Sequence, residues 1–174
     1  AENGLTPRFR RLLFDLSDDL NYLYDRIGKL DLEIKEIANS DPVAVRLQQL
    51  RGVGPLVATA LIAAVGDGQQ FANGRQLAAA IGLTPKQFSS GGKDKLLGIS
   101  KRGDAYLRTI LIHGARSAIY KAKTRDDNLS IWMTSLATRR HVNVAAVGLA
   151  NKTARMAWAM MTKGVDYKPD CAVA

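Results

Sequence analysis

Residues 47–65 read Leu-Gln-Gln-Leu-Arg-Gly-Val-Gly-Pro-Leu-Val-Ala-Thr-Ala-Leu-Ile-Ala-Ala-Val. The apolar spacing on either side of Gly-Val-Gly predicts two short helices, Val43 to Leu50 and Leu56 to Val65, joined by a tight turn. Asp41 and Pro42 are suited to begin the first of them as N-cap and first helical residue. The rest of the fold is predicted outward from this pair of helices.

Two short helices joined by Gly-Val-Gly are typical of a helix-hairpin-helix. In that motif the second helix presents N-terminal N–H groups to a backbone phosphate, so it binds DNA without reading base sequence. Gly52 and Gly54 are therefore candidate DNA-binding residues. A purely structural pair of helices remains the alternative.

The segment before the hairpin has an apolar residue at every third or fourth position, which predicts one long helix from Pro7 to Ala38. The repeat is a heptad, so it predicts a coiled coil and a homodimer or higher homo-oligomer through residues 9–37. In a parallel dimer, Arg26 would pair with Asp31 of the other helix. A core helix, or an antiparallel neighbour in the same chain, remains the alternative. The a positions are Leu13, Leu20, Ile27 and Ile34, and the d positions are Leu16, Leu23, Leu30 and Ile37.

Helical patterns also dominate the chain after the hairpin, and no β-strand of useful length is predicted. The fold class is therefore all-α, with a coiled-coil helix over residues 1–41 followed by a compact helical domain over residues 42–174 that contains the helix-hairpin-helix. The further helices are expected at Gly74 to Ile81, from Gly103-Asp104 to about Lys123, at Leu129 to Arg139 and at Asn143 to Lys163.

A basic stretch from Thr84 to Arg108 contains Ser89 and Ser90 directly before Gly91 and Gly92. Glycines let a backbone approach an anion closely, so the stretch suggests a hydroxyl held near a phosphate. A flexible basic loop is the commoner explanation of such a pattern, and we expect the loop to be disordered in the free protein. The cations of the stretch are Lys86, Lys93, Lys95, Lys101, Arg102 and Arg108.

Composition narrows the classes of partner. The chain has 174 residues and a net charge of +9, divided into −3 over residues 1–41 and +12 over the remainder. This excess favours nucleic acid as the partner, and no apolar run is long enough to predict a membrane span. One cysteine, Cys171, and two histidines predict neither a disulfide framework nor a metal site, and an intracellular compartment is expected.

Five segments taken in order resemble the C-terminal transposase domain of a bacterial insertion-sequence family, the one numbered one hundred and ten, and its eleven-eleven subgroup in particular. The likeness covers about two thirds of the chain. The segments are Leu-Arg-Gly-Val-Gly-Pro at 50–55, Ala-Ala-Ile-Gly-Leu-Thr-Pro at 79–85, Ser-Ser-Gly-Gly-Lys at 89–93, Gly-Ile-Ser-Lys-Arg-Gly-Asp-Ala-Tyr-Leu-Arg at 98–108 and Ala-Asn-Lys-Thr-Ala-Arg at 150–155.

The resemblance implies a DNA recombinase that moves an insertion element by serine chemistry, guided by a structured RNA, in the bacterial cytoplasm at the nucleoid. A full-length member begins with a RuvC-like domain whose four acidic residues hold Mg²⁺. We expect this chain to be the C-terminal portion of a longer protein, to need no cofactor of its own and to be inactive in strand exchange alone. The acidic residues of the heptad helix, Asp15, Asp18, Asp19 and Asp25, do not replace that domain.

Carried over to this sequence, the resemblance makes Ser90 the nucleophile, with Ser89 as the rival. Attack on a phosphodiester would hold the DNA as a phosphoserine and conserve the ester bond, so no nucleotide cofactor is required. Cations of the same stretch would neutralise the charge of the transition state or bind flanking phosphates. Those cations are Lys93, Lys101, Arg102 and Arg108, and the candidate DNA-binding set also includes Lys95, Gly91 and Gly92.

A different class of function fits the same residues. A non-enzymatic helix-hairpin-helix protein, dimerised by its N-terminal helix, would also bind DNA in a salt-dependent way. An interaction scaffold without a nucleic-acid role is hard to reconcile with +12 outside the heptad helix.

Overall fold

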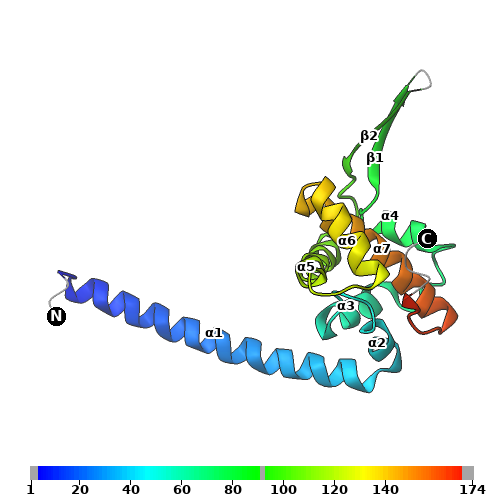
Figure 1. Cartoon of the computed structure of the whole chain (residues 1–174). Helices are drawn as coiled ribbons and strands as arrows, with labels where there is room; N and C mark the ends of the chain where they lie inside the picture. The colour runs from blue at the N-terminus through cyan, green and yellow to red at the C-terminus, as the bar shows by residue number, and fades with distance from the viewer. Residues whose placement is uncertain (1–3, 91–92, 170–174) are drawn as a thin grey trace.

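The computed structural model describes residues 4–90 and 93–169. Helix α1 (Pro7–Ser40) confirms the long N-terminal helix, and Thr6 caps it by accepting a hydrogen bond from the Phe9 N–H at 3.3 Å. Figure 1 shows α1 extending away from the other helices, and it contacts α2 (Pro42–Leu47) and α3 (Pro55–Val65). Of its described residues Ala38 is the buried one, so the alternative of a core helix is wrong.

The helices α2 and α3 form the predicted hairpin. Asp41 accepts hydrogen bonds at Oδ1 from the N–H groups of Val43 at 2.7 Å and Ala44 at 3.4 Å, which confirms it as the N-cap. Helix α2 ends at Leu47, three residues earlier than predicted, because the following backbone turns tightly through hydrogen bonds from Leu50 to Leu47 and from Val53 to Leu50. The hairpin turn therefore spans residues 48–54.

Four further helices complete the body of the molecule, all within one or two residues of their predicted bounds. They begin at side-chain caps that the sequence supplies, such as Asn73 and Asp104. Gly164 adopts the left-handed conformation (φ 63°) that ends the last of them. The helices are α4 (Gly74–Ala80), α5 (Ala105–Ala122), α6 (Asn128–Arg139) and α7 (Val142–Lys163).

Helix α7 is the centre of the core, because α2, α4, α5 and α6 all pack against it. Its inner face is mostly alanine, which lets neighbouring backbones approach closely and leaves larger side chains from the other helices to fill the space. The buried residues of α7 are Ala145, Ala146, Leu149, Ala150, Thr153, Ala154, Ala157 and Met160. None of the helices in the described ranges has the length and apolar character required to cross a bilayer.

A two-stranded antiparallel ribbon projects from this helical body (Figure 1). It consists of β1 (Pro85–Ser90) and β2 (Lys93–Ile99), so the prediction that the chain has no strand is wrong over these residues. The signal that was overlooked is Gly-Gly between two runs of strand length, a common two-residue connection of a β-hairpin. The fold is still all-α in class, with seven helices and this ribbon in the described part of the chain.

The hairpin turn is fixed to the helical body by a contact between two backbones. Gly52 has φ +79°, and a Cβ added to it would lie 2.4 Å from the carbonyl oxygen of Gly114 on α5. A Cβ added to Gly114 would in turn lie 1.9 Å from the Gly52 oxygen. Both positions therefore require glycine. At Gly114 a side chain would collide with the Gly52 carbonyl, and at Gly52 a side chain would both collide with Gly114 and strain the left-handed backbone conformation.

This contact predicts that Gly52→Ala lowers the free energy of unfolding by about 2–5 kcal/mol, from left-handed strain together with overpacking. Gly54→Ala is the matched control, because Gly54 has φ −103° and its added Cβ would meet nothing within 4 Å. Urea unfolding of both variants measures the difference. Equal stabilities of the two variants would contradict the close contact.

Candidate functional site

The ribbon carries both candidate nucleophiles next to its turn. In the register of the two strands Ser89 is opposite Asp94 and Ser90 is opposite Lys93, and these are the last described pairs before the connection. The backbone of Ser89, Ser90, Lys93 and Lys95 is extended and paired, where the sequence predicted a loop. Gly91 and Gly92 lie outside the described residues, as do the side chains of residues 89–96.

At the base of the ribbon, backbone hydrogen bonds join the segment between α4 and β1 to the segment that follows β2. The Ser100 N–H donates to Thr84 O at 2.8 Å, and the Lys101 N–H donates to Gly82 O at 3.2 Å. Gly82 and Gly103 both have positive φ angles, and an added Cβ at either would collide with backbone. Asn151 of α7 also donates from Nδ2 to Leu83 O at 3.2 Å. The two ends of the ribbon are therefore held by the helical body.

Arg108 acts at this base as a clamp. Its Nη1 donates to the carbonyl oxygen of Ile81 at 2.8 Å, and also faces those of Arg102 at 3.3 Å and Asp104 at 3.4 Å. One guanidinium thus links the end of α4 to the segment that returns from β2. The sequence assigned Arg108 to phosphate binding, and the structure gives it this positioning contact.

The structure does not bring all predicted site residues together. Lys101 and Arg102 are exposed at the base of the ribbon, beside the Arg108 clamp. Ser90 lies five strand residues beyond Pro85, which corresponds to about 17 Å along the ribbon. These three cations therefore cannot contact the same phosphate as Ser90 of their own chain, whereas Lys93 is paired with it in the ladder.

Gly52 and Gly54 form a second, separate region. Figure 1 shows the hairpin of α2 and α3 on the side of the helical body away from the ribbon. Gly52 is occupied by its contact with Gly114, whereas Gly54 is open to added atoms and begins α3 without any side-chain cap. A pocket of about 230 Å³ adjoins the turn, and its lining includes Lys121 and Arg125 but no carboxylate.

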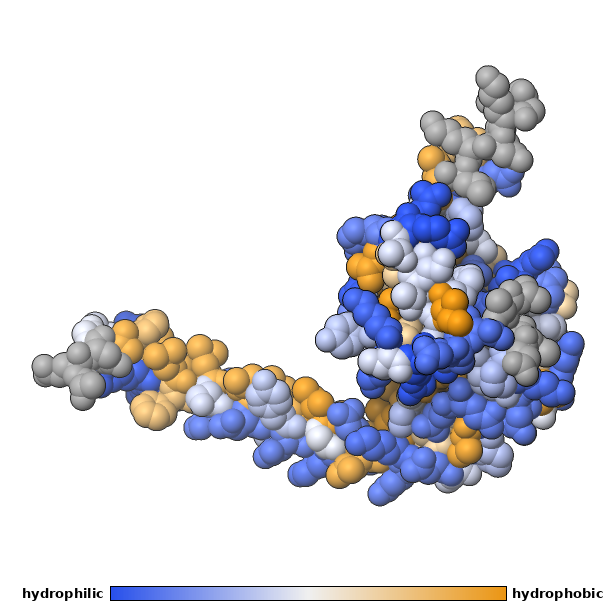
Figure 2. Space-filling view, in the orientation of Figure 1, coloured by the Kyte–Doolittle hydropathy of each residue, from blue (hydrophilic) through white to orange (hydrophobic). Residues whose placement is uncertain are grey.

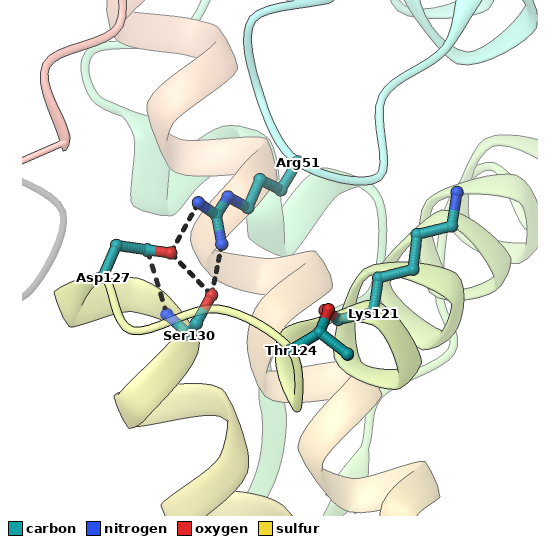
Figure 3. Close-up of polar contacts among 5 residues, drawn as sticks. All are labelled: Arg51, Lys121, Thr124, Asp127 and Ser130. Atoms are coloured by element: carbon teal, nitrogen blue, oxygen red, sulfur yellow. Dashed lines mark hydrogen bonds and ion pairs between the residues drawn. The ribbon is translucent and has the colours of Figure 1, made fainter.

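Arg51 connects this hairpin to the start of α6 (Figure 3). Its Nη2 lies 2.7 Å from Asp127 Oδ2, and its Nη1 donates to the hydroxyl of Ser130, which is fully buried. Ser130 donates from Oγ to Asp127 Oδ2 at 2.8 Å, and its N–H donates to Oδ1 at 3.1 Å. The guanidinium, the carboxylate and the hydroxyl of this cluster therefore all have partners. Nothing in the local pattern of the sequence links residues so far apart.

The cluster also fixes the protonation state of Asp127. Burial opposes ionisation, but the hydrogen bonds from Ser130 and from Arg51 together outweigh it and lower the pKa of Asp127 to about 2 from 3.8. The carboxylate is thus charged over the whole physiological range. Its contacts make it a structural link between the hairpin and α6.

No group of three or more His, Cys, Asp or Glu side chains within residues 4–90 and 93–169 is placed to hold a metal ion. The carboxylates of α1, including Asp15, Asp18 and Asp25, lie on an exposed helix. Mg²⁺ prefers oxygen ligands in octahedral geometry, commonly including one or two carboxylates. The resemblance places the Mg²⁺ site in a different, RuvC-like domain. The described residues of this chain offer no group of ligands that would fit such a site.

Residues 44–129 match the profile described as Transposase IS116/IS110/IS902 family. These matched residues make up just under half of the 174-residue chain, and this part of the chain is similar to that transposase family. The matched region begins just after α1 and includes the hairpin, the whole ribbon with Ser89 and Ser90, and the Arg51–Asp127 pair.

Full-length relatives agree with this match. The chain is 46% identical over 165 residues to the transposase for insertion sequence element IS1111A of Coxiella burnetii, covering 95% of this chain and 45% of that protein. It is 46% identical over 158 residues to a probable family 20 transposase of Pseudomonas aeruginosa, covering 91% and 47%. The chain thus spans about half the length of the curated relatives it matches.

A test of the Arg51 cluster compares Arg51→Met with Arg46→Met, whose partner Asp166 is exposed and 3.6 Å away. Arg51→Met should lower the free energy of unfolding by about 1–3 kcal/mol, because it leaves Asp127 and Ser130 short of a partner. Arg46→Met should change it by less than about 1 kcal/mol.

The pH dependence of this difference follows from the lowered pKa of Asp127. The contribution is fully present above the ordinary value of 3.8 and is lost as pH falls toward about 2, where Asp127 becomes protonated. Urea unfolding at about pH 6 and near pH 2.5 should therefore show the deficit of Arg51→Met shrinking at the lower pH. A deficit that is constant with pH would contradict the assigned role of Asp127.

Proposed function

We propose that this chain is the part of an insertion-sequence transposase that presents the serine nucleophile to DNA. The observation that carries the proposal is the ribbon, which belongs to the matched family domain and holds Ser90 at its end, beyond the helical body (Figure 1). The relatives are named transposases of insertion sequences, and the excess of positive charge suits a DNA partner.

The proposed reaction is strand exchange through a covalent intermediate. Ser90 Oγ attacks the phosphorus of a DNA phosphodiester, the Oγ–P bond forms, and the bond from phosphorus to the 3′ oxygen breaks. The released 3′ oxygen takes up a proton, and a different 3′ hydroxyl later reverses the attack and frees Ser90. The ester bond is conserved at each step, so the exchange needs no external energy source.

The position of the ribbon also bears on where the groups that activate Ser90 come from. A serine hydroxyl is a weak nucleophile until a base accepts its proton, and the body of this chain lies away from the ribbon's end (Figure 1). We therefore propose that the activating groups come from the RuvC-like domain or from a second protomer. The guide RNA and Mg²⁺ that the resemblance implies belong to the same proposal, as does action on DNA at the nucleoid.

Dimerisation through α1 completes the proposal. Figure 2 shows apolar side chains along α1, and Leu16, Leu20 and Ile27 are 64%, 51% and 53% exposed. Exposed apolar stripes of this length mark an interaction surface, and a heptad repeat favours a second α1 as the partner. Sedimentation that finds a strict monomer at tens of micromolar would contradict a dimer of this kind.

A non-enzymatic DNA-binding protein is the second candidate, and the observation that favours it is the hairpin of α2 and α3. The uncapped start of α3 and the cations around the hairpin pocket are suited to contact a DNA backbone without any reaction. This candidate predicts binding without a covalent product.

Covalent capture separates the two candidates. The complete transposase is incubated with Mg²⁺, guide RNA and nicked or mismatched DNA that prevents rejoining, and denaturing gels then detect protein joined to DNA. The adduct should form with the unchanged protein and with Ser89→Ala, the matched control, and should be lost with Ser90→Ala because only Oγ of Ser90 forms the bond. An adduct that persists in Ser90→Ala places the nucleophile elsewhere, and DNA binding without any adduct favours the second candidate.

A further inference from the structure

A groove on the helical body, distinct from both the ribbon and the hairpin, has several cations and no carboxylate among the described residues that line it. It is an open cavity of about 640 Å³ lined by residues of α4, α6 and α7, and α4 and α6 each pack against α7 (Figure 1). The residues used below are Asn73 and Arg75 at the start of α4, Trp132 of α6, and Lys152 and Arg155 of α7.

Close packing of two helices brings the cations of the groove together. A Cβ added to Gly74 would lie 2.8 Å from the Cα and the carbonyl oxygen of Arg155, so the first turn of α4 is pressed against the backbone of α7. This contact sets Arg75 beside Arg155. Lys152 lies one turn before Arg155 on the same helix, where residues three apart are neighbours.

Within residues 4–90 and 93–169, no ion pair neutralises the three cations. The lining of the groove contains no Asp or Glu, and the ion pairs found among the described residues involve Arg46 and Arg51 instead. Burial, and next the positive charge of Arg155, lowers the pKa of Lys152. Like charges gathered in this way repel each other, and an anion bound between them would relieve that repulsion.

An aromatic ring lies in the same groove. Lys152 Nζ is 5.2 Å from the centroid of the Trp132 ring, a cation–π contact, and both side chains are half-buried. Lys152 and Arg155 both line the groove, and the Arg155 side chain is exposed. A tryptophan beside phosphate-binding cations is the combination with which proteins bind single strands, by stacking unpaired bases.

We propose that this groove binds a single-stranded segment of nucleic acid, with a phosphate between Arg75, Lys152 and Arg155 and an unpaired base at Trp132. The inference rests on the proposed nucleic-acid function but concerns a surface remote from Ser90. The size of the groove suits a nucleotide, since small-ligand sites range from about 300 to 1,000 Å³. Duplex DNA keeps its bases stacked inside, so it would leave Trp132 unused.

The test measures binding of fluorescent oligo-dT, oligo-U and a duplex, each about 20 nucleotides long, which exceeds a typical single-strand site. Anisotropy titrations at several salt concentrations use the 174-residue chain and two groove variants, Lys152→Met with Arg155→Gln and Arg75→Gln with Arg155→Gln. The second variant changes only exposed side chains, so it is expected to keep the fold, and thermal melting checks both. Lys29→Met with Lys35→Met on α1 removes the same charge and is the matched control.

Both groove variants should bind single strands about tenfold more weakly, and the slope of log K against log salt should fall by about 0.7 for each phosphate that the groove no longer neutralises. The control should bind within about twofold of the unchanged chain. Tighter binding of oligo-dT than of oligo-U identifies DNA as the source of the strand, and the reverse identifies RNA. The proposal is overturned if groove and control variants bind single strands equally, or if the groove variants weaken only duplex binding. Covalent capture of DNA by Ser90 is measured separately from single-strand binding by the groove. Failure of one proposal can therefore be distinguished from failure of the other.

Discussion

The close backbone contact between Gly52 and Gly114 is the constraint on which the helical body depends. It seats the hairpin of α2 and α3 directly on α5, at a distance that no side chain could occupy. The Arg51 cluster then joins the same turn to the start of α6. These contacts, with the alanine-rich face of α7, pack short helices into one body, while α1 and the ribbon extend away from it (Figure 1).

This arrangement divides the chain into regions with separate tasks. The ribbon holds the candidate nucleophile, α1 offers an apolar stripe for association, and the hairpin and the groove collect positive charge on the body. Because the ribbon extends beyond the body, the residues at its base position the ribbon. They do not contact the phosphate that Ser90 is proposed to attack. Arg108 illustrates this, since its guanidinium is directed at backbone carbonyls.

The sequence predicted those features that local chemistry determines. The caps at Asp41, Asn73 and Asp104 and the apolar periodicity of the helices placed nearly every boundary, because capping and amphipathic spacing act within a few residues. The strands were missed because their pattern is short and polar. Close backbone contacts at Gly82 and Gly103 hold the base of the ribbon. No local sequence pattern predicts these contacts.

The candidate site was predictable only in part for the same reason. The residue pattern singled out Ser89 and Ser90 and the family resemblance ranked Ser90 first, whereas their place next to the turn of a ribbon came from the structure. The link from Arg51 to Asp127 and the contact of Gly74 with the backbone of Arg155 join residues far apart in the sequence, and such contacts depend on the whole packing.

Hydrogen exchange at the base of the ribbon tests most directly whether its two ends are held together where they leave the helical body. The amides of Ser100 and Lys101, which donate to Thr84 O and Gly82 O, should exchange much more slowly than an unstructured chain. Arg108→Met should speed their exchange, whereas Arg102→Met, which changes an exposed side chain, should not. Exchange of both amides at unstructured rates in the unchanged protein would contradict a ribbon whose two ends are joined at its base.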